Sequence, residues 1–162
     1  MKLTLAPLND AEVPLLTQLM TAAFDADAPN DSTFDQQLLA CYRNSDFFQR
    51  WPPGCIDTFV YTLWVEHAPV GAAVIWYYSP HEAVLGLFFI ALPWQSKGLG
   101  LLCWQELERL HADVRHWTVA APLWSPATRR FYERQCGFRR VGMSGRDYVC
   151  YAKNGLASNS SP

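Results

Sequence analysis

The feature that most constrains this fold is an apolar segment followed by a glycine-rich turn and an amphipathic helix. Residues 83–92 are apolar on both faces, as in a strand buried within a sheet. The turn is Gln95-Ser96-Lys97-Gly98-Leu99-Gly100, and apolar residues then recur at helical spacing, at Leu99, Leu102, Cys103, Leu107 and Leu110. Such a turn leaves the first backbone N–H groups of the helix accessible, at the positive end of the helix dipole. It therefore predicts a site for a phosphate-bearing ligand.

Two other glycine-rich phosphate motifs do not fit this turn. A dinucleotide-binding fingerprint requires a third glycine at position 103, which is Cys103 here. A P-loop requires lysine directly after its second glycine, whereas Gly98 follows Lys97. Taken alone, the Gly98-x-Gly100 pair is equally compatible with an ordinary tight turn.

The rest of the chain alternates β-rich and helical segments without an internal repeat, which indicates one α+β domain. Strands are expected at 3–6, 59–66, 70–78, 116–121, 138–143 and 148–152. One helix is expected at about 10–24, and another begins at Ser32 and covers 34–42. A further helix is expected from the cap Ser125-Pro126 to Gln135, with Gly137 as its terminator. Residues 154–162 are polar and are expected to fray, so the predicted domain is 1–153.

Composition excludes several classes of function. The net charge is −2 and no basic block occurs, which argues against nucleic-acid binding. No apolar run has the length of a membrane span, and the N-terminal residues lack a signal-peptide pattern, so a cytoplasmic location is expected. The five cysteines form no C-x-x-C pair and are expected to be reduced. The four histidines have no metal-ligand spacing and are expected at surface or turn positions, so no metal is predicted.

Two stretches, in this order, resemble the motifs of the GCN5-related N-acetyltransferase (GNAT) family. Gln95-x-x-Gly98-x-Gly100 is similar to the family's Gln/Arg-x-x-Gly-x-Gly/Ala. Ser125-x-x-Thr128-x-x-Phe131-Tyr132-Glu133-x-x-x-Gly137-Phe138 is similar to its Asn-x-x-Ala-x-x-Phe-Tyr-Glu-x-x-Gly-Phe. Each could occur by chance, but both together, with one strand between them, are specific. The resemblance covers roughly residues 61–143.

The resemblance implies a mixed, largely antiparallel sheet with helices on both faces. Its fourth and fifth strands would splay apart so that the pantetheine arm of acetyl-CoA enters between them. Ile90 and Leu92 would offer backbone groups to that arm. Residues 95–100 would cradle the pyrophosphate, with main-chain donors at Ser96, Lys97, Gly98 and Gly100, and with Gln95 and Leu99 completing the loop. Ser125 and Tyr132 would also lie at the cofactor, Tyr132 near the sulfur.

Three positions depart from the family pattern. Leu92 occupies the usual proline position, and Pro93 follows one residue late. Ser125 replaces the usual asparagine, and N-capping is its expected role. One extra residue, Cys136, lies between the phenylalanine-tyrosine pair and Gly137, so the end of that helix is expected to differ.

Two titratable residues are candidates for catalysis. The strand expected at 83–90 carries no titratable side chain, and only Glu82, at its start, is a candidate general base; a solvated hairpin position is the alternative. Tyr132 is the expected general acid for the leaving thiolate. Helical spacing places Thr128 and Gln135 on the face of Tyr132, and Ala127 and Phe131 on a face that packs on the sheet.

Residues 25–57 are irregular and rich in Asp, Phe, Tyr and Pro, which is typical of a functional loop. We expect them to supply most of the acceptor pocket, with Trp51 lining it and Asp46 binding the acceptor. The other acids of the segment that could attract a cationic amine are Asp25, Asp27 and Asp31.

The sequence therefore predicts an acetyl-CoA-dependent N-acetyltransferase that acts on a small amine by direct transfer. Two alternatives stay open: a non-catalytic acyl-CoA sensor of the same fold, and an acetyltransferase for protein N-termini or lysines. A homodimer is compatible with the many tryptophans, for which core packing is the simpler explanation.

Overall fold

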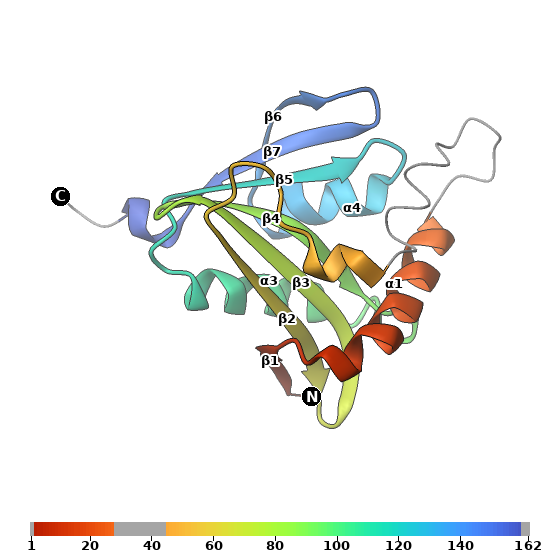
Figure 1. The fold of residues 1–162 in the computed structure, drawn as a ribbon. Coiled ribbons are helices and arrows are strands. Elements are labelled where there is room, and N and C mark those ends of the chain that lie inside the picture. Colours follow the sequence, from red (N-terminus) through yellow and green to blue (C-terminus); the bar gives the residue numbers. More distant parts are fainter. Residues whose placement is uncertain (1, 28–44, 160–162) are drawn as a thin grey trace.

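The computed structural model describes residues 2–27 and 45–159. Seven strands form one open sheet in the order β1-β2-β3-β4-β5-β7-β6 (Figure 1). Among these described strands, only β4 and β5 pair in parallel. The strands are β1 (Leu3–Pro7), β2 (Asp57–Val65), β3 (Ala68–Ser79), β4 (Glu82–Ile90), β5 (His116–Pro122), β6 (Arg139–Ser144) and β7 (Tyr148–Asn154). The predicted mixed, mostly antiparallel sheet is confirmed.

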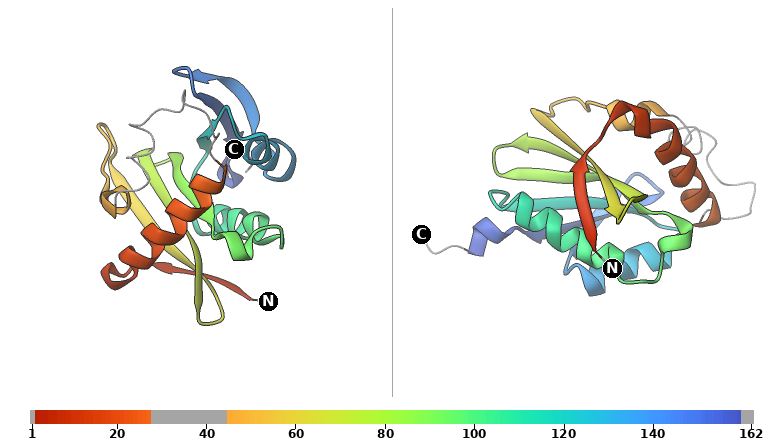
Figure 2. Two further views of the ribbon diagram at one scale, coloured as in Figure 1. Left: turned by 90° about the vertical axis from the view of Figure 1, so that its right-hand side faces the viewer. Right: turned by 90° about the horizontal axis from the view of Figure 1, so that it is seen from below.

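Helices cover both faces of the sheet, as predicted (Figure 2). The helix α1 (Val13–Asp27) follows a 3-10 turn, η1 (Asp10–Glu12), which Asn9 caps through its side chain. The opposite face carries α3 (Leu99–Leu110) and α4 (Pro126–Arg130), the latter continued by a π-helical turn, η4 (Phe131–Gln135). Short 3-10 helices complete the described chain: η2 (Ser45–Gln49), η3 (Leu92–Trp94) and η5 (Leu156–Asn159).

Some of the predicted boundaries differ from the structure. The helix predicted from Ser32 lies outside the described residues. Beyond the predicted domain limit at residue 153, Gly155 N–H donates to the Arg115 carbonyl and η5 follows. Within the described ranges, no helix combines the length and the apolar character that crossing a membrane requires.

A β-bulge at Gly86 divides the side chains of β4 between two cores. Ile75 of β3 pairs with Leu85 and Val74 pairs with Leu87, so Gly86 is the extra residue of the bulge. Leu85 consequently packs in the core beneath α3, while Leu87 packs in the core beneath α1. A β-carbon at Gly86 would lie 2.6 Å from the Trp76 ring, which explains the glycine. The bulge also decides which side chains of the later part of β4 face each helix.

His111 lies in the turn that follows α3, which agrees with the predicted turn position, but it is buried between two tyrosines and does not lie on the surface. Its side chain is 7% exposed. Its Nε2 lies 2.8 Å from the Tyr61 hydroxyl and its Nδ1 lies 2.6 Å from the Tyr77 hydroxyl. A neutral imidazole has one donor and one acceptor nitrogen, so it satisfies both tyrosines. Burial lowers the pKa of His111, and burial, with smaller effects from Tyr61, Asp113 and Asp57, raises the pKa of Tyr77 to about 12.

The first prediction concerns the backbone contact between β3 and the end of β4. Gly71 pairs with Ile90, and a β-carbon on Gly71 would lie 2.1 Å from the Phe89 carbonyl oxygen. Gly71→Ala should therefore lower the unfolding free energy by about 3 kcal/mol, because neither backbone can yield without strain. Gly142→Ala is the control, since its new methyl group meets no atom within 4 Å. Equal denaturation midpoints for the two variants would contradict this interpretation.

The second prediction follows from the lowered pKa of His111. The unfolded histidine binds a proton near its ordinary pKa of about 6.5, but the folded one does so only at lower pH. Its contribution to stability is therefore complete above that value and is lost as the pH falls through the folded pKa. Between pH 7.5 and pH 5 the wild type should lose more thermal stability than His111→Gln. A variant that loses as much as the wild type would disprove this origin of the acid sensitivity.

Candidate functional site

The site begins where β4 and β5 stop pairing. Their parallel ladder runs only from Glu82 opposite His116 to Leu85 opposite Val119. Beyond Leu85, β4 continues to Ile90 and keeps only β3 as a partner. The predicted splay between the fourth and fifth strands is thus confirmed.

The end of β4 presents backbone groups to this opening. Phe89 turns its carbonyl oxygen toward Gly71 of β3, and Ala91 N–H donates to Val70 of β3 over 2.7 Å. Successive residues of a strand direct their N–H and C=O groups to opposite edges. The N–H and C=O of Ile90 therefore point into the opening, on the side away from β3.

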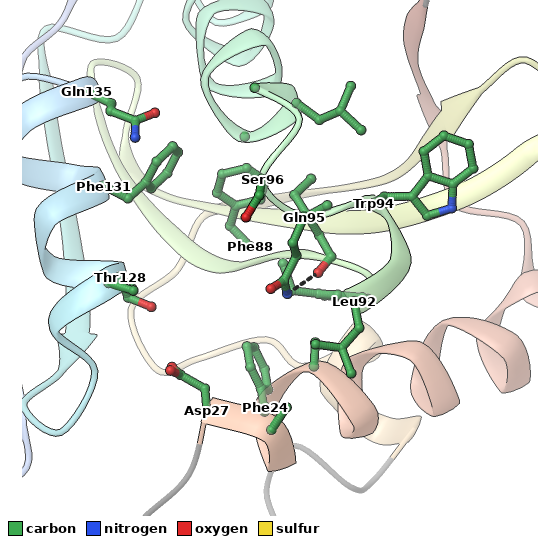
Figure 3. A pocket seen from close by; sticks show the side chains of 18 of the residues that line it. Phe24, Asp27, Phe88, Leu92, Trp94, Gln95, Ser96, Thr128, Phe131 and Gln135 are labelled. Carbon is green, nitrogen blue, oxygen red and sulfur yellow. Dashed lines mark hydrogen bonds between the residues drawn. The ribbon is translucent and has the colours of Figure 1, made fainter.

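Gln95 ties the loop after β4 back to this edge. Its side-chain amide donates to the Ile90 carbonyl oxygen over 2.8 Å (Figure 3). The backbone N–H of Gln95 donates to the Leu92 carbonyl and closes η3. Gln95 thus positions the loop, while the Ile90 N–H has no part in that contact.

The loop that follows has the backbone conformation of an anion-binding turn. Ser96 and Gly98 both have positive φ, at 62° and 80°. Leu102 N–H is bonded to the Gly98 carbonyl as the first turn of α3 closes, so the N–H groups of residues 99–101 lie before that first bond. A positive φ at a serine is uncommon, and such conformations concentrate at functional sites. The residues present fit a phosphate group, which the helix dipole also favours.

Two positions of the loop require glycine, each for a different physical reason. A β-carbon on Gly98 would meet no atom within 4 Å, so its left-handed backbone is what requires glycine. A β-carbon on Gly100 would lie 3.0 Å from the Phe131 ring. Gly100 therefore lets η4 pack closely on the start of α3, and this contact forms one wall of the site.

The extra residue of the second motif is accommodated by the π-helical turn. Cys136 N–H donates to the carbonyl of Phe131, five residues earlier, over 3.0 Å. Gly137 then ends the helix with φ +82°, as predicted. The wider turn lets both Phe131 and Tyr132 line the site, and turns of this kind are common at functional sites. Phe131 also stacks 5.9 Å from Phe88, so its predicted contact with the sheet is present too.

These elements surround a cavity of about 720 Å³ that draws on both faces of the sheet. Phe24 and Phe89 come from the face covered by α1, whereas Phe88 and Phe131 come from the face covered by α3. Figure 3 shows side chains from α1, β4, the loop and α4 directed into this space. The described lining is Ala23, Phe24, Ala26, Asp27, Phe88, Phe89, Ile90, Leu92, Trp94, Gln95, Ser96, Gly98, Leu99, Gly100, Ala127, Thr128, Phe131, Tyr132 and Gln135.

Tyr132 lies deep in the wall of the cavity. It is 5% exposed, and its ring centre lies 5.7 Å from that of Phe138 and 6.4 Å from that of Tyr151. Burial raises the pKa of its hydroxyl well above the ordinary value for tyrosine. The side chain is therefore a neutral phenol over the whole physiological range, which is the form that can donate a proton.

The structure brings only part of the predicted set together. Eight predicted residues line the cavity: Ile90, Leu92, Gln95, Ser96, Gly98, Leu99, Gly100 and Tyr132. Ser125 does not, because it is fully buried and its hydroxyl caps α4 by accepting from Thr128 N–H. Lys97 is exposed on the loop, outside the cavity lining.

The predicted base and acceptor residues lie elsewhere. Glu82 is at the opposite end of β4 from Ile90, and its carboxylate accepts from the Ser79 hydroxyl. Trp51 is 58% exposed and donates to the Cys55 carbonyl, away from the described lining. Asp46 belongs to η2, and its side chain lies outside the described part, as does Asp31.

Phe24 and Asp27 bring the last turn of α1 to the cavity. Asp27 is one of the acids that were expected to attract a cationic amine, whereas no expectation placed Phe24 at the site. The helical periodicity of α1 predicted its buried face but not what its end approaches. No group of histidines, cysteines and acids that could hold a metal ion occurs among the described residues.

The comparison with family models decides the family. Residues 16–138 match the model of the acetyltransferase (GNAT) family. The chain belongs to the GNAT family. The predictions of an acyltransferase and of acetyl-CoA as donor are confirmed at the level of the family.

Individual relatives and solved structures show which known proteins this chain is similar to in sequence and in fold. YrkN of Bacillus subtilis (strain 168), described as uncharacterised, is 30% identical over 90 residues, which are 55% of this chain and 47% of that protein. This GNAT chain thus spans about half the length of that relative. An acetyltransferase from Thermus thermophilus superposes with a TM-score of 0.70 at 24% identity, over 95% of this chain and 97% of that one. The PaiA N-acetyltransferase from Thermoplasma acidophilum, in complex with coenzyme A, superposes with a TM-score of 0.72 at 12% identity, over 95% of this chain and 99% of that one.

The third prediction tests the loop as the acetyl-CoA site. Gly98→Ala adds a methyl group on the open side of the loop, where the pyrophosphate is expected, and Gly145→Ala adds one at a remote turn. Both glycines have positive φ and open surroundings, so both variants should lose about 1 kcal/mol of stability. Wild type and Gly145→Ala should melt at a higher temperature in millimolar acetyl-CoA, whereas Gly98→Ala should show little increase. An equal increase in all three proteins would place the donor elsewhere.

Proposed function

We propose that this protein transfers the acetyl group of acetyl-CoA directly to the nitrogen of a small amine. The observation that carries the proposal is the convergence of three features on one cavity. These are the unpaired edge of β4 at Ile90, the start of α3 at Gly98 and the buried phenol of Tyr132. Such a combination suits a donor that is anionic at one end and carries a reactive carbonyl at the other.

The loop and the strand edge would hold the donor. The first N–H groups of α3 bind the pyrophosphate oxygens, where both hydrogen bonds and the helix dipole favour negative charge. The pantetheine amides run along the opening and take the place of a strand beside β4, as a peptide does when it adds to a sheet edge. The PaiA enzyme, which has the same fold, forms a complex with coenzyme A, and this supports coenzyme A as the carrier of the donor here.

The reaction needs a stabilised oxyanion and a protonated leaving group. The amine attacks the thioester carbon, a C–N bond forms, and the C–S bond breaks. The Ile90 N–H donates to the carbonyl oxygen as negative charge develops there. Tyr132 gives its proton to the departing sulfur. The amine loses its proton to water, and Tyr132 regains a proton from water after the thiol has formed. Glu82 has no step, because it lies at the far end of β4.

The cavity of about 720 Å³ lies in the size range of small-molecule sites, which favours a small acceptor over an extended protein segment. Aromatic and aliphatic side chains line it from both faces of the sheet. The described cysteines are unpaired, which suits the cytoplasm as the place of action.

The fourth prediction concerns Tyr132. Tyr132→Phe keeps the ring and its packing but removes the transferable proton. Positioned proton transfer contributes about 100- to 10,000-fold in rate, or roughly 3 to 5 kcal/mol of barrier. The turnover number should fall by about this factor in a thiol-release assay, while the dissociation constant for acetyl-CoA stays close to that of the wild type.

The same preparation separates catalysis from a structural role. A hydroxyl that only stabilises the core would give a lower melting temperature with nearly normal turnover, and that result would remove Tyr132 from the reaction. A wild type that binds acetyl-CoA but releases no thiol with any amine in a broad panel would favour the non-catalytic sensor.

A further inference from the structure

The cavity contains one ionised side chain among its described lining residues, that of Asp27. The other described lining residues are apolar, aromatic or neutral polar. Figure 3 shows the Asp27 carboxylate, at the end of α1, and the Thr128 hydroxyl, on α4, both directed into the space between these helices. Among the described lining residues, Asp27 is therefore the group that sets the sign of charge in this part of the cavity.

Asp27 and Tyr132 occupy different depths. Asp27 is exposed, whereas Tyr132 is 5% exposed and buried in the core beneath α3. The two side chains also come from helices on opposite faces of the sheet. Under the proposed chemistry the reacting nitrogen lies near Ile90 and Tyr132. The Asp27 carboxylate is thus placed at the mouth, where it meets a part of the acceptor away from that nitrogen.

The walls near Asp27 offer it no positive partner within the described lining. Phe24, one turn before Asp27 on α1, presents an aromatic ring, and Leu92 presents an aliphatic side chain that is 43% exposed (Figure 3). A carboxylate beside apolar walls repels an anion, leaves a neutral group without electrostatic gain, and attracts a cation.

We infer that the acceptor is an amine with a second positive charge, and that Asp27 pairs with this second charge while the other end reacts. The inference rests on the proposed function and narrows its substrate class from small amines to dications. Because the mouth is open to solvent, screening reduces the strength of the pair. We expect a preference of about 5- to 20-fold for a dication over an amine whose far end is neutral. This lies between the effect of an exposed ion pair and that of a desolvated charged hydrogen bond.

Three probes of equal length test the charge at the far end of the acceptor. They are 1,4-diaminobutane, 4-aminobutan-1-ol and 4-aminobutanoate, which end in a cation, a neutral hydroxyl and an anion. With the wild type, kcat/KM from thiol release should follow that order. The ratio between diamine and amino alcohol should fall as salt rises, because the pair is partly exposed.

Two matched variants show whether Asp27 is the cause. Asp27→Asn removes the charge and keeps the shape, so the ratio between diamine and amino alcohol should approach about 2, the statistical ratio for two amines against one. Asp10→Asn removes the same charge from an exposed residue in η1, remote from the cavity lining, and should keep the wild-type ratio. Equal rates for the diamine and the alcohol in the wild type, or a ratio that Asp27→Asn leaves unchanged, would overturn the inference.

A binding measurement keeps this test separate from the proposed function. Isothermal titration of the diamine and the alcohol into protein saturated with coenzyme A requires no turnover. Tighter binding of the diamine that Asp27→Asn abolishes supports the inference even if no probe is acetylated, in which case only the proposed function fails. Absence of diamine binding, or equal binding by wild type and Asp27→Asn, overturns the inference even if acetyl transfer occurs.

Discussion

The structure depends on the loss of pairing between β4 and β5 beyond Leu85. A strand inside a sheet normally has both edges bonded, and an unpaired edge leaves polar backbone groups that need partners. Gln95 satisfies the Ile90 carbonyl, while the Ile90 N–H stays directed into the opening. The start of α3, the π-helical turn and the end of α1 all border this gap. The missing strand is thus the place that a ligand can fill.

The opening has two chemically different sides because the sheet separates them. The bulge at Gly86 turns Phe89 toward the α1 core, and Phe88 toward the α3 core. On the α3 side, backbone N–H groups and a neutral phenol favour an anionic donor and a developing negative charge. On the α1 side, the described lining carries a carboxylate, Asp27. One cavity therefore joins an end that suits an anion to an end that suits a cation.

The π-helical turn shows how a local departure from a motif is absorbed. One extra residue ahead of Gly137 would rotate the end of a regular helix by about 100°. The bond from Cys136 N–H to the Phe131 carbonyl instead encloses that residue in a wider turn. Phe131 keeps its contact with Gly100, and Gly137 still ends the helix with a left-handed conformation. The insertion therefore changes the helix without displacing the wall of the cavity.

The sequence by itself determined the parts of this protein that depend on a few neighbouring residues. The glycine-rich turn before α3, the Ser125 cap and the end at Gly137 follow from backbone preferences within three to five positions, and the paired motifs pointed to the family. Tertiary structure alone decided that the last turn of α1, with Phe24 and Asp27, borders the cavity, and that His111 is buried between Tyr61 and Tyr77. Hydrophobic periodicity tells which face of an element is buried, but not which distant element meets it. That is set by strand register, by the bulge at Gly86 and by the packing of helices on a twisted sheet.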